Sequence, residues 1–217
     1  MKNLFIYHKG KRLRCGYTTG TCAAAAAKAS AYMLLHQRLL EEIEITTPGE
    51  VTLQLELNRA NYSEHSAASS IIKDAGDDHD STDGIEIVAD VSKRTDGEIN
   101  ILGGVGIGTF TKPGFWGEVG EPAINPVPKE MIHTAVSSVS DCGWDITISA
   151  PQGEEIARKT LNKKLGIEGG ISIIGTKGIV EPMSVEALKQ TIYLEIDAIH
   201  KDSPGEILLF LGNYGQN

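Results

Sequence analysis

The segment from Leu13 to Lys28 constrains the fold more than any other part of the chain, because it places five consecutive alanines directly after a turn rich in threonine and glycine. An alanine run favours a helix, and its small side chains let that helix pack closely on a sheet. Thr19 or Thr21 is expected to cap this helix, and Gly20 lets the backbone turn sharply. The free N–H groups of the first turn would then face a carboxylate or phosphate. A helix that is only capped and packed on a sheet is the alternative interpretation.

Hydrophobic periodicity divides the rest of the chain into short strands and a few helices. Apolar and polar residues alternate on both sides of the turn at 47–50, which predicts a hairpin of half-buried strands. The expected strands are 4–8, 11–15, 42–45, 51–57, 85–91, 99–102, 146–150 and 171–174. The expected helices are 20–39, one that begins at Pro128, 154–165 and 184–200. A last apolar strand at 206–211 ends in a glycine turn, as the first strand of a parallel α/β domain does.

Composition limits the class of protein. A chain of 217 residues with 41% hydrophobic content can bury one sizeable core, with room for a small appendage. It has no apolar run long enough to span a bilayer and no secretory leader, so we expect a soluble, cytoplasmic protein. Cys15, Cys22 and Cys142 lack the short paired spacings of a zinc site and are too few for a disulfide framework, which predicts free thiols.

The formal net charge of −9 argues against a general affinity for nucleic acid or anionic membranes, because both need a basic protein surface. The same charge repels small anions. An anionic ligand would therefore need a local basic pocket within an acidic protein.

Five stretches, in this order along the chain, resemble the motifs of the cobalt-precorrin-5B C1-methyltransferases of the oxygen-independent cobalamin pathway. They are 16–23, 72–78, 103–114, 120–128 and 170–176. Members of that family are longer than this chain. The resemblance implies an α+β fold over residues 1–203, similar to the second domain of ribosomal protein S5 and serving to bind substrate. Residues 204–217 would then begin an incomplete parallel α/β domain.

The resemblance also implies the transfer of a methyl group from S-adenosylmethionine to ring carbon C1 of cobalt-precorrin-5B. The partner would be the cobalt tetrapyrrole, with cobalt present only as part of the substrate and no separate metal site. The methyl donor is expected at the glycine turn formed by Gly212, Asn213 and Gly215. Neither nucleic acid nor a membrane is an expected partner, and a homo-oligomer is allowed.

A tetrapyrrole with acetate and propionate arms would require cations and donors close to the glycine-rich motifs. The candidates are Arg14, Thr18, Thr19, Gly20, Thr21, Lys73, Gly104, Gly106, Gly108, Lys112 and Asn125. The glycines at 104–108 are not followed by a helix, which excludes a dinucleotide fingerprint, and they would let a flat ligand approach the backbone. Solvated surface cations and a mobile glycine loop are the alternatives.

The acidic loop at 74–84 contains five carboxylates and an imidazole. It allows three interpretations: oxygen ligands for magnesium or calcium, Asp side chains that cap backbone N–H groups, or substrate contact and proton removal by Asp74, Asp77 and Asp78. Glu121 lies beside a stiff segment with three prolines, which would hold its carboxylate in place, and it is a fourth catalytic candidate.

Two other functions remain open. As alternatives to a methyltransferase, the chain would be a tetrapyrrole-binding module without turnover or a metal-dependent enzyme that uses the loop from Asp74 to Asp83. Hydrolytic triad chemistry has no support, because no Gly-x-Ser-x-Gly or His-Glu-x-x-His spacing occurs. Methyl transfer requires neither motif, since the protein mainly aligns an already activated donor with its acceptor.

Overall fold

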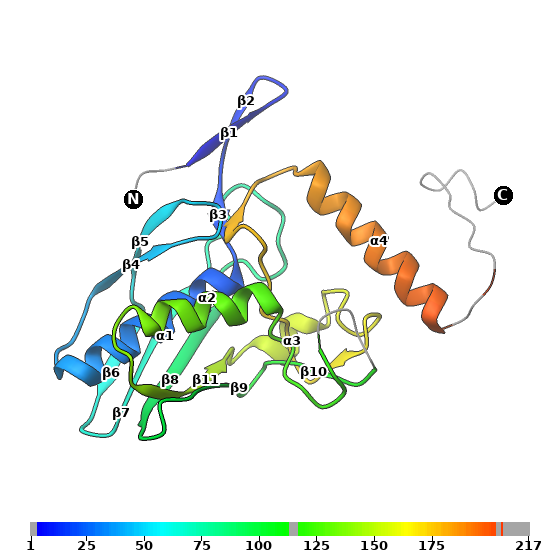
Figure 1. The fold of residues 1–217 in the computed structure, drawn as a ribbon. Coiled ribbons are helices and arrows are strands. Elements are labelled where there is room, and N and C mark those ends of the chain that lie inside the picture. The colour runs from blue at the N-terminus through cyan, green and yellow to red at the C-terminus, as the bar shows by residue number, and fades with distance from the viewer. Residues whose placement is uncertain (1–3, 113–116, 203–204, 206–217) are drawn as a thin grey trace. The chain divides into compact units, whose positions relative to one another are not determined.

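The structure is a computed structural model that describes residues 4–112, 117–202 and 205. The chain divides into two compact units, Met1–Met183 and Ser184–Asn217. The first unit contains a five-stranded sheet in the order β6-β7-β8-β11-β9 (Figure 1). Its strands are β6 (Arg59–Tyr62), β7 (Ser66–Ile72), β8 (Glu86–Arg94), β9 (Ile99–Gly103) and β11 (Gly143–Ser149). This arrangement confirms the α+β class.

Neighbouring strands of this sheet are antiparallel except β11 and β9, which are parallel and pair Ile146 with Ile101. One face is apolar and buried, and along β11 buried apolar residues alternate with polar residues that point to the other face. The other face is polar and reaches solvent even in its centre, where Asp90 of β8 is exposed. Trp144 of β11 is fully buried, and its indole N–H has no hydrogen-bond partner in the described part of the chain.

Helix α1 (Thr19–His36) occupies the centre of the unit. Its nine N-terminal residues, 19–27, are all buried, including the alanines at 23–27. A helix surrounded by protein on every side needs small residues wherever another element comes close, which is why the alanine run suits this position. The helix ends at Gln37, whose φ of 50° is the left-handed conformation that terminates helices.

Two serines fasten α1 to the sheet through buried hydrogen bonds. The Ser30 hydroxyl donates to the carbonyl of Ala89 at 2.9 Å, and the Ser69 hydroxyl donates to the carbonyl of Ala26 at 2.8 Å. The two hydroxyl oxygens are 3.0 Å apart. These bonds link α1 to β7 and β8 and satisfy polar groups that would otherwise be costly to bury.

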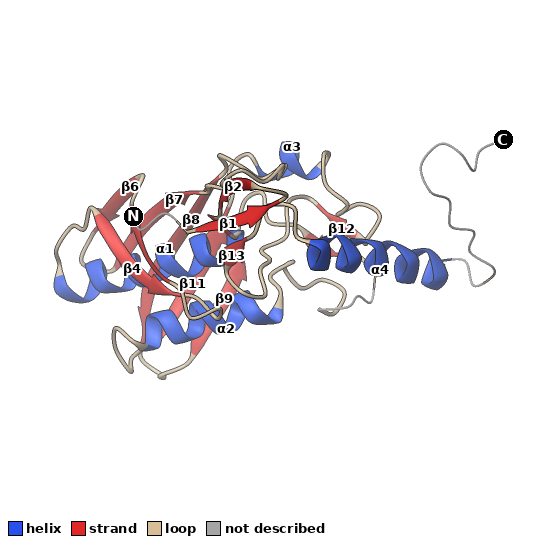
Figure 2. Cartoon of the chain, turned by 90° about the horizontal axis from the view of Figure 1, so that it is seen from above, coloured by secondary structure: helices blue, strands red, loops and turns tan. Residues whose placement is uncertain are grey.

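Helix α2 (Pro126–Ser137) lies beside α1, as both Figures 1 and 2 show. It begins two residues before the predicted start at Pro128. Both Pro126 and Pro128 fall in the first turn, where the missing N–H costs no intrahelical bond. Met131, Ile132, Ala135 and Val136 form its buried stripe and complete the core.

Four two-stranded sheets surround this core. They pair β1 (Phe5–His8) with β2 (Lys11–Arg14), β4 (Glu42–Thr46) with β5 (Thr52–Glu56), β10 (Thr109–Phe110) with β12 (Ile167–Glu168), and β3 (Gly16–Tyr17) with β13 (Ile179–Val180). The β4–β5 pair confirms the expected hairpin, and β1 and β2 match the expected strands at 4–8 and 11–15. All three cysteines are free, as expected.

Several predicted elements differ from those observed. Strands β6 and β7 were not expected, because the Ala- and Ser-rich run at 66–70 has little apolar alternation. The helix expected at 154–165 is only α3 (Gly153–Ala157), which is followed by turns. The strand expected at 171–174 is extended but forms single bridges only, from Ile171 to Ile107 and from Ile173 to Ile124.

The second unit contains α4 (Val185–Asp202), which matches the helix expected at 184–200. Among the described residues, no helix is long and apolar enough to cross a membrane. The expected strand at 206–211 lies outside the described residues.

The packing of α1 leads to a stability prediction. Replacing Ala24 with Leu is expected to lower the free energy of unfolding by about 1–3 kcal/mol, because the larger side chain has no space in the surrounding core. Urea denaturation measures this change. The same substitution at Ala187, an exposed position of α4, is the control and should change stability little. Equal stability of the two variants would show that the surroundings of α1 are loosely packed.

Candidate functional site

Thr18 caps α1, and its side-chain oxygen accepts a hydrogen bond from the backbone N–H of Thr21 at 3.2 Å. The expectation that Thr19 or Thr21 is the cap is therefore wrong. Thr18 is the residue with extended backbone, which brings its hydroxyl over the first turn. The Thr19 and Thr21 hydroxyls instead bond a segment distant in sequence, at Ile174 and Gly178.

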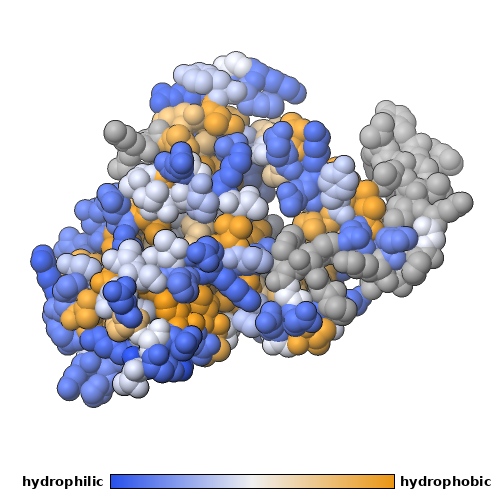
Figure 3. Space-filling model, in the orientation of Figure 1, coloured by the Kyte–Doolittle hydropathy of each residue, from blue (hydrophilic) through white to orange (hydrophobic). Residues whose placement is uncertain are grey.

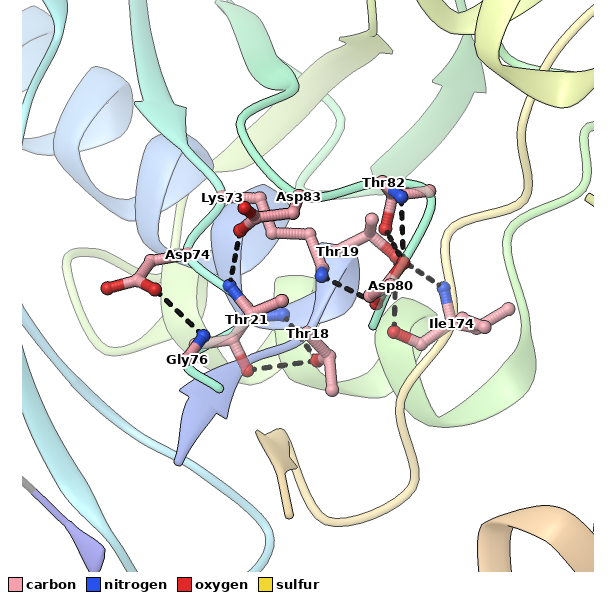
Figure 4. Close-up of polar contacts among 11 residues, drawn as sticks. Thr18, Thr19, Thr21, Lys73, Asp74, Gly76, Asp80, Thr82, Asp83 and Ile174 are labelled. Atoms are coloured by element: carbon pink, nitrogen blue, oxygen red, sulfur yellow. Dashed lines mark hydrogen bonds and ion pairs between the residues drawn. The ribbon is translucent and has the colours of Figure 1, made fainter. Parts of the chain in front are cut away.

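A strap formed by residues 174–178 covers the N-terminus of α1 (Figure 4). The N–H of Gly20 donates to the Ile174 carbonyl at 3.0 Å, and the N–H of Ile174 donates to the Thr19 hydroxyl at 2.9 Å. The Gly178 carbonyl accepts from the Thr21 hydroxyl at 2.7 Å and from the Thr18 N–H at 3.1 Å. The prediction of free N–H groups facing a ligand is therefore wrong for Gly20 and Thr21, because the chain itself supplies their partners.

Glycines make this close approach possible. A Cβ on Gly175 would lie 2.3 Å from the Thr18 Oγ1 atom, and one on Gly178 would lie 2.6 Å from Cβ of Thr47. Gly20 likewise leaves room for Pro128, whose ring carbon would be 2.8 Å from an added Cβ. The N-termini of α1 and α2 therefore meet at the strap.

The carboxylates of the acidic loop cap backbone N–H groups of the chain. Asp74 accepts from Gly76 at 2.8 Å, Asp77 from Arg14 at 2.7 Å, Asp80 from Thr82 at 2.7 Å and Asp83 from Ala75 at 2.8 Å. This pattern confirms the interpretation of the loop as a set of Asp caps. No group of three or more potential metal ligands occurs among the described residues.

Lys73 immediately precedes the loop and is buried, with 2% of its side chain exposed. Its ammonium donates to Asp80 at 2.7 Å, and Figure 4 shows this pair next to Thr19. Burial alone would raise the pKa of Asp80, but the charge and hydrogen bond of Lys73 and the two hydrogen bonds from Thr82 lower it below its ordinary value. Lys73 was predicted to contact the substrate; the structure shows it paired within the chain.

Arg14 forms a two-bond ion pair with Asp74 at the outer side of the loop, with Nη2 and Oδ1 2.8 Å apart. This hydrogen bonding is the main reason why the pKa of Asp74 lies below its ordinary value. Both side chains are about one third exposed, at 32% each, so this pair remains within reach of a ligand. Asp78 accepts a long hydrogen bond from Met183 N–H at 3.4 Å.

The glycine loop packs on the chain's own backbone. An added Cβ would lie 2.2 Å from the Ser149 hydroxyl at Gly104, 1.9 Å from the Ala150 carbonyl at Gly106 and 2.4 Å from the Ile167 side chain at Gly108. The loop N–H groups also have partners, since Gly104 donates to Ile148 and Gly108 donates to Ile171. The close approach that these glycines allow is therefore to protein, and contact with a flat ligand stays a prediction.

Asn125 immediately precedes α2 and makes no side-chain cap bond. Its side-chain oxygen is buried and has no hydrogen-bond partner among the described residues. Its N–H donates to the carbonyl of Ile173, the residue before the strap, so Asn125 belongs to the same end of the unit as Thr19 and Gly20. A buried acceptor without a donor is costly unless a ligand supplies one.

Of the remaining predicted residues, those that the structure describes lie outside the cluster formed by the N-terminus of α1, the strap and Asn125. Glu121 accepts from the N–H of Glu118 at 3.2 Å and lies 3.7 Å from Lys129, while the stem of Lys112 lies over Gly166. Gly212, Asn213 and Gly215 lie outside the described residues.

Two features of the cluster escaped sequence reasoning. Asp80 was seen only as one acidic residue among several, although the order Asp80-Ser81-Thr82 is typical of an Asp that caps the residue two positions later. The strap over α1 had no local signal beyond its two glycines.

Cys22 lies within the first turns of α1 and is fully buried. Burial raises the pKa of its thiol to about 12, so the group stays protonated at neutral pH. It is therefore poorly suited to act as a nucleophile.

Replacing Asp80 with Asn is expected to destabilise the unit by about 3 kcal/mol at neutral pH, because Lys73 would stay buried without a counter-charge. The pKa of Asp80 is lower in the folded state than in the unfolded state, so its ionised carboxylate stabilises the wild-type fold. This stabilisation is fully present at pH values above the unfolded-state pKa of about 3.9 and is lost as the pH falls through the folded-state pKa. The Asp80→Asn variant should lack that part of the acid dependence. Urea unfolding from pH 7 to pH 3 measures both effects.

The matched control for Asp80 is Asp141→Asn, which removes an exposed carboxylate and should follow wild type at every pH. An Asp80→Asn variant as stable as wild type at neutral pH would contradict the importance of the buried pair.

Comparison with known proteins places this geometry in a family. The CbiD family model matches residues 6–182. The cobalt-precorrin-5B C(1)-methyltransferase of Alkaliphilus oremlandii is 56% identical over 217 residues, which cover 100% of this chain and 61% of that protein. The enzyme of the same name from Treponema denticola is 54% identical over 220 residues, covering 99% and 60%.

Among solved structures, the crystal structure of cobalamin biosynthesis protein (cbiD) from Archaeoglobus fulgidus matches with a TM-score of 0.65 and 32% identity over 89% of this chain and 64% of that one. The chain spans less than two thirds of the length of each of these relatives. Because the family model covers most of the described first unit, the chain belongs to the CbiD family.

Proposed function

We propose that this chain takes part in the methylation of C1 of cobalt-precorrin-5B, with S-adenosylmethionine as the methyl donor. Membership of the CbiD family carries this proposal, together with relatives named cobalt-precorrin-5B C(1)-methyltransferase that match along the whole chain. The five motifs that suggested the same activity all lie within the residues that these relatives match.

The first unit is the proposed substrate-binding part. Asn125 supports this role, because its buried oxygen lacks a donor, which a protonated carboxyl group on the substrate's ring would supply. Arg14 and Asp74 form a partly exposed ion pair, and Asp77 lies next to it and bonds the Arg14 N–H. These groups would orient the macrocycle by charge and hydrogen bonding, while the activated donor supplies the methyl group.

Other assignments are also part of the proposal. Thr18, Thr19, Gly20 and Thr21 would act by fixing the position of the strap, to which they are bonded. Lys73 would act by fixing Asp80, its partner within the chain. Asp78 and Glu121 are kept as catalytic candidates, and Gly104, Gly106, Gly108 and Lys112 as substrate contacts. The donor site at Gly212, Asn213 and Gly215 lies outside the described residues, and no step is assigned to it.

We also propose that the fold of the first unit resembles that of the second domain of ribosomal protein S5. It is supported by a mixed sheet with α1 and α2 packed together on one buried face. A substrate domain at 1–203 followed by the start of a second domain at 204–217 is proposed with it.

A tetrapyrrole-binding module without turnover is the second candidate, because the chain spans less than two thirds of its relatives. Incubation of the chain with cobalt-precorrin-5B and methyl-labelled donor separates the two functions. A labelled macrocycle would exclude the binding module.

A chimera provides the sharper test of the methyltransferase. In the Alkaliphilus oremlandii relative, residues 1–217 of this chain would replace the matching part. We expect the chimera to transfer labelled methyl groups to cobalt-precorrin-5B as its parent does. A folded chimera that binds neither macrocycle nor donor, beside an active parent, would contradict the proposed function.

Within that chimera, Asn125→Ala is expected to lower kcat/KM about tenfold, as the loss of one buried hydrogen bond to a ligand would. Stability should change by less than about 1 kcal/mol, because the amide oxygen has no partner to lose in the free protein. Labelled-methyl kinetics and urea unfolding measure the two effects. Asn61→Ala, an exposed position of β6, is the control and should alter neither. A strong loss of stability in Asn125→Ala would instead assign a structural role.

A further inference from the structure

Positive charge is concentrated at the beginning of this acidic chain. The first 40 residues contain seven of the 20 Lys and Arg residues and none of the 29 Asp and Glu residues. Four of these cations, Lys9, Lys11, Arg12 and Arg14, lie in or next to the tight turn of the β1–β2 hairpin. A basic element on a protein of net charge −9 creates a local positive potential that favours an anionic partner.

The hairpin projects from the first unit (Figure 1), and hydrophilic atoms gather over its tip in the space-filling view (Figure 3). Lys9 and Gly10 form the turn with φ values of 47° and 77°, the left-handed conformations of a two-residue hairpin turn. At its base, the N–H of Cys15 donates to the Leu4 carbonyl at 2.8 Å, and the N–H of Arg14 donates to Asp77. The hairpin is thus a defined arm fixed at the acidic loop.

Strand register places aromatic and guanidinium groups on one face of the arm. Phe5 pairs with Arg14 and Tyr7 pairs with Arg12, so these four residues share a face. The Arg12 guanidinium lies 3.6 Å from the centre of the Phe5 ring, while the Tyr7 side chain is 78% exposed. Flat aromatic and guanidinium surfaces next to each other are suited to stacking against a planar ligand.

Three cations of the arm have no carboxylate partner among the described residues. Arg14 pairs with Asp74, but Lys9, Lys11 and Arg12 form no ion pair with any carboxylate of the described chain, and all three are exposed. Clustered like charges repel one another, and a bound anion removes that cost.

Resting on the proposed function, we propose that the β1–β2 hairpin binds the tetrapyrrole substrate, with Lys9, Lys11 and Arg12 pairing with its acetate and propionate groups and Tyr7 stacking against its ring. The arm meets the Arg14–Asp74 pair at its base, which makes it continuous with the candidate site. A compact polycarboxylate fits better than nucleic acid, because the acidic body around such a short arm would repel a long phosphate backbone.

Titration of cobalt uroporphyrin into the 217-residue chain tests the proposal without any catalytic step. This probe carries an acetate and a propionate on every pyrrole. We expect Lys9→Gln/Lys11→Gln/Arg12→Gln to weaken binding about tenfold or more, as the loss of several modest ion pairs predicts, and to reduce the salt dependence of binding. The charge-conserving variant Lys9→Arg/Lys11→Arg/Arg12→Lys should keep near-wild-type affinity.

The matched control is Lys93→Gln/Lys159→Gln/Lys163→Gln, which removes the same charge from exposed positions elsewhere and should bind like wild type. Cobalt deuteroporphyrin, with far fewer carboxylates, should bind wild type more weakly than cobalt uroporphyrin. Unfolding midpoints verify that every variant is folded.

Equal affinity of the hairpin variant and the control variant would overturn the hairpin site while leaving the proposed methyl transfer intact, since the chimera assay tests that separately. The absence of cobalt uroporphyrin binding to the wild-type chain would also overturn it. Tighter binding of a single-stranded RNA oligonucleotide than of cobalt uroporphyrin, or a dimer in sedimentation that the hairpin variant abolishes, would assign the arm to another partner and reject the proposal.

Discussion

The close packing of α1 is the constraint on which the rest of the first unit depends. Its N-terminal half is buried on every side, so the sheet, α2 and the strap at 174–178 can each approach it only where side chains are small. The alanines at 23–27 allow this approach along the helix, Gly20 allows it at the first turn, and Gly175 and Gly178 allow it from the strap. Ser30 and Ser69 then fix the rotation of the helix on the sheet.

Charge at the candidate site is balanced pair by pair. Lys73 and Asp80 form a largely buried pair, whereas Arg14 and Asp74 are partly exposed. The remaining Asp side chains of the loop, Asp77, Asp78 and Asp83, accept hydrogen bonds from backbone N–H groups. A loop that looks like a strong negative patch in the sequence therefore has most of its carboxylates engaged. The Arg14–Asp74 pair and the cationic hairpin remain exposed, whereas the oxygen of Asn125 is buried without a partner among the described residues.

Sequence reasoning succeeded where local pattern decides the structure. The alanine helix, the two hairpins and the amphipathic α4 all have strong periodicity or turn chemistry, and each was found within a few residues. Sequence reasoning failed where the local structure depends on segments that are distant in the sequence. Strands β6 and β7 are too small and polar to be recognised before the sheet exists, and the cap at Thr18 depends on backbone conformation. The open helix end was predicted from residues 18–21 alone, while the strap that closes it comes from residues 174–178.

That separation has a consequence for folding on the ribosome. The bonds from Thr19 to Ile174 and from Thr21 to Gly178 span 155 and 157 residues. Until nearly the whole first unit has been synthesised, the N-terminus of α1 keeps exposed hydroxyls, and its alanine surface lacks part of its cover. Contacts this distant in sequence close large loops and form late. The core of the first unit therefore stays unfinished until residues 174–178 are available, and the strap is expected to close it late.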